Sequence, residues 1–269
     1  MIFTLIDSVK AVVLGAVEGI TEFLPISSTG HLILLNQFVY FREEFTALFD
    51  IVIQLGAILA VTVYFRDRIW PFGRNKGKNQ KIWNIWLKTA LGVIPVILVG
   101  AVFGETIKEK LFYPWIVALA LLVGGVIILI IENKKKTNEI ISLEDLTFKT
   151  AFFVGLIQCL SMIPGTSRSA ATIMGAIVLG ASRTAATEFS FYLAIPTMLA
   201  ASAYSLLKYK SALSLHEFSI LVIGFVVAFI MAFSVVKFFV NYAKRRDFKN
   251  FGYYRIALGI LIILYFLIK

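Results

Sequence analysis

The chain has 269 residues, of which 59% are hydrophobic and 16% charged, and its mean hydropathy is +0.86. A soluble globular chain is nearer half apolar and a quarter charged, so this composition excludes a soluble enzyme and indicates a membrane protein. The formal net charge of +10 comes from basic residues clustered between apolar segments, as in Lys134-Lys135-Lys136, where the positive-inside rule expects them. No nucleic-acid partner is therefore predicted.

In chain order, one broken apolar segment is followed by three continuous ones, and this order occurs twice. Residues 8–41 are interrupted by the polar cluster Pro25-Ile26-Ser27-Ser28-Thr29-Gly30, and residues 149–183 by Pro164-Gly165-Thr166-Ser167-Arg168-Ser169. The continuous segments have the length of spanning helices and cover residues 48–65, 83–104, 112–131, 187–207, 218–241 and 251–268. We predict an all-α polytopic membrane protein that forms a single domain over residues 1–269.

Each broken segment is predicted to be a re-entrant helix–loop–helix hairpin. A break at membrane depth would leave backbone groups unpaired in lipid, so it is tolerated only where protein buries it or where it lines a wet cavity. Each half is also too short to cross the bilayer alone. Both arms of a hairpin should therefore enter and leave by the same side.

The two broken segments, called hairpin one and hairpin two below, are similar in sequence. Residues 14–21 align with residues 154–161 at a spacing of 140, and after a one-residue slip Pro25 meets Pro164 at a spacing of 139. Three spans follow each copy, and because three is odd the second copy should be inverted across the membrane. The halves of this inverted-topology repeat are predicted at about 1–132 and 149–269.

The basic residues support this topology. They concentrate in the loops at 66–88, 132–149 and 242–250, which we therefore place in the cytoplasm with both chain ends outside. Hairpin one should then dip in from the outer face and hairpin two from the cytoplasmic face. Their polar tips should meet inside the membrane.

Hairpin one carries two carboxylates in apolar sequence. Glu18 and Glu22 are four residues apart, so a helix projects both from one face. Charges inside a membrane are costly and are functional hypotheses by default. A shared proton, an Arg or a divalent cation with oxygen ligands would neutralise the pair, and the alternative without a function is a carboxylate pair that burial keeps neutral.

Polar residues after Pro25 begin the second arm of hairpin one. One hydroxyl would suffice to cap the new helix. Three consecutive hydroxyls at residues 27–29, with His31 one helical turn after Ser28, exceed that need. A hydroxyl beside an imidazole is the minimum arrangement for an activated nucleophile or a proton relay.

The loop of hairpin two has the composition of an oxyanion cradle. Its glycine allows close backbone approach, its Ser and Thr add donors, and Arg168 adds a bidentate fork at the start of a helix. Arg168 is the only charged residue in the stretch 150–182. A structural Arg paired with Glu18 or Glu22 is the rival interpretation, and one Arg can serve both roles in different states.

The inverted arrangement would surround one cavity with two carboxylates, a Ser/His cluster and a phosphate cradle. Such groups suit metal-assisted phosphoryl transfer, in which a cation clamps the phosphate oxygens, Arg stabilises developing charge and a hydroxyl or imidazole attacks phosphorus. A lipid phosphate is the simplest substrate that reaches a site inside the bilayer.

The polar loops also resemble the motifs of a known family. The chain carries EGITEFLPISSTGH at residues 18–31, PGTSRSAAT at residues 164–172, Gln54-Leu55-Gly56 and Glu188-Phe189-Ser190-Phe191. These strings resemble the signatures of the undecaprenyl-diphosphate phosphatases, the bacitracin-resistance proteins. The resemblance implies a multi-pass enzyme of the bacterial plasma membrane that hydrolyses undecaprenyl diphosphate to undecaprenyl phosphate and inorganic phosphate. Such an enzyme recycles the carrier lipid of peptidoglycan synthesis and confers bacitracin resistance.

The resemblance further implies a divalent cation (Mg or Ca), two re-entrant hairpins and an active site that opens to the outer side. By motif position Glu18 and Glu22 are expected to bind the metal, and Glu22, Ser28, His31 and Arg168 to be catalytic. The nucleophile is either Ser28 or His31. We favour Ser28 with Glu22 as its orienting base and His31 as acid or base, because a serine needs a base and has candidates nearby. The expected substrate-binding residues are Ser27, Thr29, Gly165, Thr166, Ser167, Ser169 and Thr172.

The alternative function is a transporter or flippase of a polyprenyl phosphate. Inverted repeats with broken helices and a midplane polar site also describe secondary carriers. A pure carrier needs no nucleophile and releases no phosphate, so a chemical test separates the two functions. The partners predicted are undecaprenyl diphosphate, membrane lipids and a possible second copy of the chain in a homodimer.

Overall fold

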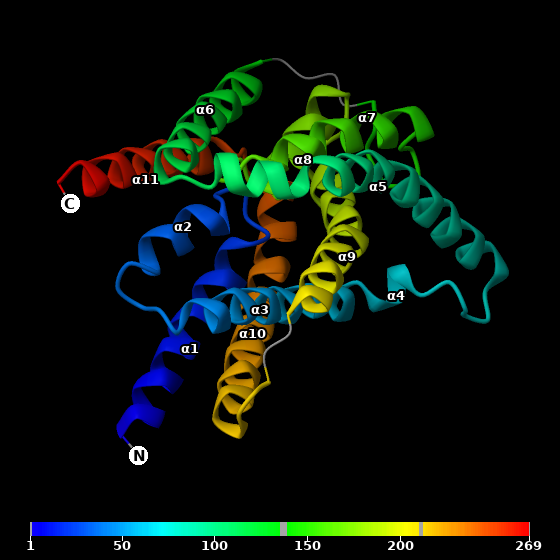
Figure 1. The fold of residues 1–269 in the computed structure, drawn as a ribbon. Coiled ribbons are helices and arrows are strands. Elements are labelled where there is room, and N and C mark those ends of the chain that lie inside the picture. The colour runs from blue at the N-terminus through cyan, green and yellow to red at the C-terminus, as the bar shows by residue number, and fades with distance from the viewer. Residues whose placement is uncertain (1, 135–138, 210–211, 269) are drawn as a thin grey trace.

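The computed structural model describes residues 2–134, 139–209 and 212–268, which form helices joined by short loops (Figure 1). Six long helices in these residues match the predicted spans and are apolar enough to cross a membrane. They are α3 (Glu43–Tyr64), α5 (Lys76–Leu111), α6 (Pro114–Asn133), α9 (Arg183–Lys208), α10 (Leu215–Arg245) and α11 (Lys249–Ile268). The predicted all-α polytopic membrane protein is thus confirmed.

Both broken segments fold as two arms around a loop, and of the four arms only the first arm of hairpin one is long. Hairpin one consists of α1 (Ile2–Thr21) and α2 (Ser28–Leu35). Hairpin two consists of α7 (Phe148–Gln158), a 3₁₀ turn at Cys159–Met162, and α8 (Arg168–Val178). The first arm begins earlier than the predicted residue 8, because the residues before it are themselves mostly apolar and continue the helix. With 20 residues α1 has the length of a span, so the prediction that each half is too short to cross the bilayer is wrong for this arm. The short helix α4 (Arg66–Ile69) follows α3.

Ion pairs show which loops share an end of the helix bundle. Arg68, in α4 just after α3, pairs with Glu188 near the start of α9 at 2.8 Å. Lys81, near the start of α5, pairs with Glu144 in the loop before α7 at 2.7 Å. The basic loops at 66–88 and 132–149, both predicted to be cytoplasmic, therefore lie at one end, called the basic end below. Of the predicted Lys134–Lys136 run, residues 135 and 136 lie outside the described residues.

The opposite end carries the start of hairpin one. Asp7 of α1 contacts His216 of α10 at 3.1 Å, and Arg42, just before α3, pairs with Glu217 of α10 at 3.1 Å. Hairpin one thus enters the bundle from this end, whereas hairpin two enters from the basic end. The two hairpins are inverted relative to each other, as the odd number of spans between them predicts.

Glycines dock the first arm of each hairpin onto a long helix. A Cβ at Gly15 in α1 would collide with the carbonyl of Gly224 in α10, and a Cβ at Gly155 in α7 with the carbonyl of Gly92 in α5. Small residues of this kind let membrane helices pack closely where hydrophobicity does not drive them together. Gly15 and Gly155 are 140 residues apart. The repeat therefore extends from sequence to helix packing, while its halves, 1–132 and 149–269, stay a prediction.

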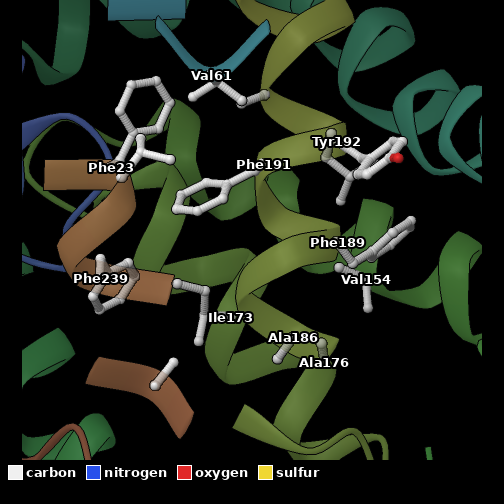
Figure 2. Packing of buried hydrophobic residues seen from close by; sticks show 14 of the residues in the cluster. Phe23, Val61, Val154, Ile173, Ala176, Ala186, Phe189, Phe191, Tyr192 and Phe239 are labelled. Atoms are coloured by element: carbon white, nitrogen blue, oxygen red, sulfur yellow. The ribbon is translucent and has the colours of Figure 1, made fainter. Parts of the chain in front are cut away.

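The largest apolar cluster lies directly beside the polar tips of the hairpins. Phe191 of α9 is its centre and packs edge-on against Phe23, with ring centroids 5.5 Å apart, and against Phe239 of α10 at 6.2 Å (Figure 2). Phe23 follows Glu22 in the chain and is fully buried. Its packing therefore fixes the place where hairpin one turns.

We expect the substitution Gly155→Ala to lower the melting temperature of the detergent-solubilised protein. The added methyl group would collide with the backbone of Gly92, and overpacking of this kind costs about 1–3 kcal/mol. Gly104→Ala in α5 is the matched control, because a Cβ there has no neighbour within 4 Å. Thermal unfolding followed by fluorescence makes the comparison, and equal melting temperatures for the two variants would contradict the prediction.

Candidate active site

The tips of the two hairpins are in direct contact. Arg168 Nη2 donates to Glu22 Oε1 at 3.1 Å, and Ser169 Oγ donates to the carbonyl of Leu24 at 2.8 Å. The side chains of Glu22 and Arg168 are only 8% and 9% exposed. Two of the predicted catalytic residues, one from each hairpin, therefore form a buried ion pair.

Both second arms begin with the same cap. Ser27 accepts a hydrogen bond from the backbone N–H of Gly30 at 3.2 Å, and Ser167 accepts one from that of Ala170 at 3.2 Å. Both serines have positive φ, 72° and 69°. This conformation costs a non-glycine residue about 1 kcal/mol or more and is concentrated at functional sites. The caps direct the N-termini of α2 and α8 into the same polar region.

The caps correct the predicted register of the repeat. Ser27 and Ser167 are 140 residues apart, the same spacing as in the first arms, so the one-residue slip inferred from the two prolines is wrong. The second arm of each hairpin, α2 or α8, begins directly after the serine with positive φ. The position of the preceding proline does not set this start. Ser28 and Arg168 are consequently equivalent as the first residues of α2 and α8.

Ser28 has the contacts of an activated nucleophile. Its Oγ donates to Glu22 Oε2 at 2.7 Å, while the other carboxylate oxygen of Glu22 accepts from Arg168. Catalytic triads consist of a nucleophile, a base within hydrogen-bond reach of it, and a third group that orients the base. Ser28, Glu22 and Arg168 have this arrangement. The predicted pairing of Ser28 with Glu22 is thus present in the geometry.

Residues of α8 and α9 hold the guanidinium of Arg168 in place. Arg168 Nη1 donates to the carbonyl of Ser190 at 3.2 Å and lies 3.4 Å from its Oγ, and Thr172 Oγ1 lies 2.7 Å from Ser190 Oγ. The ring of Phe23 lies 5.6 Å from the guanidinium carbon. Ser190 belongs to a predicted motif but has no predicted role, because nothing in the sequence shows that it faces Arg168.

His31 is linked to α11 instead of to Ser28. Its Nδ1 lies 2.8 Å from the carbonyl of Ser27, its Nε2 lies 2.6 Å from the hydroxyl of Tyr254, and the His31 and Tyr254 rings stack 5.5 Å apart. A carbonyl only accepts, so Nδ1 carries the proton and Nε2 accepts from the phenol. Tyr254 was not foreseen from the sequence, because it lies 223 residues from its partner in an apolar span.

The predicted metal-binding carboxylates have a third neighbour. Glu18 is 2% exposed and lies close enough to Glu22 and Asp50 for their charges to act on it. Asp50 of α3 was not foreseen, and its Oδ1 is buried with no hydrogen-bond partner in the described part of the chain. Within residues 2–134, 139–209 and 212–268, no three His, Cys, Asp or Glu side chains are placed to hold a metal ion. Glu18, Glu22 and Asp50 are the carboxylates that would hold a cation together with ligands from a substrate, and the predicted metal site stays a prediction.

Six of the predicted substrate-binding residues fall into three groups. Ser169 and Thr172 are fully buried and donate to backbone carbonyls, those of Leu24 and Arg168, so they support the loops from within. Thr29 and Thr166 are half-buried at the starts of the second arm and the second loop. Two predicted residues, Ser27 and Ser167, cap the half-helices as described above.

Gly165 is required by the backbone of the second loop. Its φ is +91°, which side-chain-bearing residues rarely adopt. A Cβ at this position would also lie 2.5 Å from the carbonyl of Val117 in α6. The loop can therefore approach α6 only with glycine at position 165. The carbonyl of Gly165 accepts a hydrogen bond from Arg255 Nη2 at 3.1 Å.

Comparison with known proteins identifies relatives over the whole chain. The family model described as bacitracin resistance protein BacA matches residues 11–261. An undecaprenyl-diphosphatase of Enterococcus faecalis is 46% identical over 98% of this chain and 99% of its own length. Undecaprenyl-diphosphatase 1 of Clostridioides difficile is 48% identical over 98% of both chains, and the undecaprenyl-diphosphatase of Lactiplantibacillus plantarum is 45% identical over 97% of this chain and 98% of its own.

We expect nitrogen-15 NMR of histidine-labelled protein at neutral pH to show His31 protonated at Nδ1 and hydrogen-bonded at Nε2. Tyr254→Phe removes the phenol and should change the Nε2 resonance much more than the Nδ1 resonance. The chain has two histidines, so His216→Gln assigns the signals and serves as the control. A His31 protonated at Nε2 would contradict the arrangement.

Proposed function

We propose that this chain, which belongs to the bacitracin resistance protein BacA family, hydrolyses undecaprenyl diphosphate to undecaprenyl phosphate and inorganic phosphate. The contact of Ser28 Oγ with Glu22 Oε2 at 2.7 Å is the observation that carries the proposal, because it supplies a nucleophile and a base inside a membrane protein. The names of relatives 45–48% identical over nearly the full length support the substrate. The enzyme is thus a membrane hydrolase that recycles a carrier lipid and confers bacitracin resistance.

The reaction proceeds in two displacements at the terminal phosphorus. Ser28 Oγ attacks this phosphorus while Glu22 Oε2 accepts the hydroxyl proton, and the bond to the bridging oxygen breaks. Undecaprenyl phosphate leaves with the electron pair of that bond, and the proton on Glu22 passes to the leaving phosphate. Glu22, again ionised, then takes a proton from a water molecule that attacks the phosphoserine. The bond from Ser28 Oγ to phosphorus breaks, inorganic phosphate leaves, and Glu22 returns the proton to Ser28 Oγ.

Arg168 and the two helix N-termini stabilise the charge on the phosphoryl oxygens. In the resting site Arg168 holds the base, Glu22, and with a diphosphate bound its guanidinium contacts the anion as well. α2 and α8 both begin at the site, so the positive ends of both helix dipoles point toward the substrate. This preorganised positive field is a large contribution to phosphoryl transfer.

His31 and Tyr254 form a proton path beside the nucleophile. The phenol donates to His31 Nε2 at 2.6 Å, and His31 Nδ1–H is held by the carbonyl of Ser27, the residue before Ser28. An imidazole fixed in one tautomer by a backbone carbonyl is suited to exchange a proton at its other nitrogen. The role of His31 in the proposal is therefore acid and base, and the nucleophile is Ser28.

A divalent cation, Mg²⁺ or Ca²⁺, completes the proposed site. Glu18 and Asp50 offer carboxylate oxygens beside Glu22, whose own oxygens are occupied by Ser28 and Arg168. When bound, the cation neutralises phosphate oxygens of the substrate and acts as a Lewis acid. The protein side chains orient the diphosphate for attack by Ser28.

The basic end of the bundle faces the cytoplasm of a bacterial cell in this proposal. The positive-inside rule and the clustering of the basic loops at one end support that orientation. The protein then lies in the plasma membrane, with hairpin one entering from the outer side and the site opening there. The homodimer stays a prediction.

The transporter alternative does not account for the nucleophile. A carrier of polyprenyl phosphate would use Arg168 and the helix N-termini for binding, but it would have no use for the hydrogen bond from Ser28 to Glu22. The opposed hairpins suit either function. Release of inorganic phosphate distinguishes them.

We expect Ser28→Ala to lower the rate of phosphate release from a prenyl diphosphate at least about a thousandfold, because the attacking oxygen is removed. Glu22→Gln should lower kcat roughly 10²- to 10⁴-fold, since the base is lost. Phosphate release by purified protein in detergent is measured with a colorimetric assay. Ser219→Ala, an exposed hydroxyl on α10, is the control and should keep full activity. A fully active Ser28→Ala variant would assign the attack to another group.

Removal of divalent cations with EDTA is expected to abolish phosphate release, and added Mg²⁺ or Ca²⁺ should restore it. Glu18→Gln should raise the cation concentration needed for half-maximal activity, because it removes a carboxylate from the proposed metal site. Asp145→Asn, in a loop at the basic end, provides the control for a lost surface carboxylate. Activity that resists EDTA would exclude the cation from the reaction.

A further inference from the structure

Arg255 of α11 is a buried cation that hydrogen-bonds to backbone carbonyls. Its side chain is 0% exposed, and among the described residues no carboxylate forms an ion pair with it. A buried charge is costly unless it is paired and hydrogen-bonded. Because of this cost, we expect the buried guanidinium of Arg255 to have a functional role.

Its hydrogen bonds join the loops of both hairpins to α6. Arg255 Nη1 donates to the carbonyl of Pro25 at 3.4 Å, and Nη2 donates to the carbonyls of Gly165 at 3.1 Å and Ala120 at 3.0 Å. Pro25 and Gly165 are 140 residues apart. In the register that the two serine caps define, a single guanidinium thus binds equivalent carbonyls of the two copies of the repeat.

The helix that faces Arg255 leaves space for this side chain. A Cβ at Gly124 of α6 would collide with Arg255 Nη2, and a Cβ at Gly125 would lie 2.7 Å from the carbonyl of Gly252. α6 and α11 consequently pack along glycines, side by side in Figure 1, with the guanidinium enclosed between them. A larger residue at position 124 would displace it from the loop carbonyls.

The positive charge of Arg255 favours the binding of an anionic substrate. Glu18, Glu22 and Asp50 bring three carboxylates to the site, and Arg168 is the cation among them. Arg255 adds a second positive charge directly behind both loops. Its carbonyl acceptors carry no net charge that would cancel it, and the low dielectric of a buried site preserves its effect at a distance.

We propose that Arg255 is a positioning residue that locks the loops of the two hairpins together through Pro25 and Gly165, and that its charge favours binding of the diphosphate. The lock keeps Ser28 and Arg168, the first residues of α2 and α8, opposite each other across Glu22. The inference rests on the proposed phosphatase function. It adds a residue that touches neither substrate nor nucleophile.

The variants Arg255→Lys and Arg255→Gln separate the two effects. Lysine keeps the charge but has one nitrogen, and glutamine has two N–H donors and no charge, so neither spans three carbonyls. We expect kcat for phosphate release to fall roughly tenfold or more in both variants, as for loss of hydrogen bonds to a charged group. KM should rise roughly tenfold in Arg255→Gln and stay near the wild-type value in Arg255→Lys.

Two glycine variants test the lock with Arg255 still present. Gly124→Ala displaces the guanidinium and should lower kcat at an unchanged KM. Gly259→Ala is the matched control at the same α6–α11 interface, where the atoms nearest an added Cβ belong to Leu122 and to the carbonyl of Ala118. Its kcat should stay within about twofold of wild type. If the Arg255 variants do not fold, Gly124→Ala still tests whether the contacts of Arg255 with the loops are needed for kcat.

Hydrogen–deuterium exchange reports on the loops without any substrate. In Arg255→Lys and Gly124→Ala, peptides that cover residues 23–31 and 163–169 should exchange faster together, while those of Gly259→Ala should match wild type. A rise confined to one loop, or folded Arg255 variants with kcat and KM within about twofold of wild type, would overturn the proposal. A wild-type protein that releases no phosphate would instead refute the phosphatase function, and the exchange experiment would still decide whether the lock exists.

Discussion

A carboxylate enclosed in a membrane protein needs compensating donors, and the rest of the site depends on how Glu22 obtains them. One oxygen accepts from Ser28 of its own hairpin, and the other from Arg168 of the opposite hairpin. Removing one partner of a buried pair leaves an uncompensated charge, which is far costlier than losing an exposed contact. The same contacts therefore hold the hairpins together and prepare the nucleophile, so folding and chemistry are coupled at one residue.

The opposed entry of the hairpins explains why this arrangement can exist at all. A single re-entrant loop brings one helix N-terminus into the membrane, but two loops from opposite ends bring two N-termini face to face. Gly15 on Gly224 and Gly155 on Gly92 fix the depth of each first arm. Ser27 and Ser167 then turn the chain with the same strained backbone. The positive ends of α2 and α8 thus converge where an anion is to be bound.

Most of the architecture could be predicted from the sequence, because a membrane leaves few alternatives for long apolar runs and for polar breaks between them. The pairing of Arg168 with a glutamate was open as an alternative, without a choice between Glu18 and Glu22. Glu22, Ser28 and Arg168 stood out as polar groups in apolar surroundings. The contacts of His31 with Tyr254, of Arg168 with Ser190 and of the loops with Arg255 could not be predicted. Each depends on which faces of distant spans meet, and helix packing decides that without leaving a local signal. The predicted one-residue slip in the repeat is wrong because it rests on the two prolines, whereas the capping serines define the equivalent positions.

The equivalence of Ser28 and Arg168 also concerns how the work of the site is divided. Each copy of the repeat places one residue at the head of its half-helix, and the two copies have different chemistry there: a hydroxyl in one and a guanidinium in the other. Neither copy alone contains both an attacking group and a group that stabilises charge. Two identical copies would give either two nucleophiles or two cations around one carboxylate. The repeat therefore yields a complete site only because its two copies carry different residues, Ser28 and Arg168, at equivalent positions.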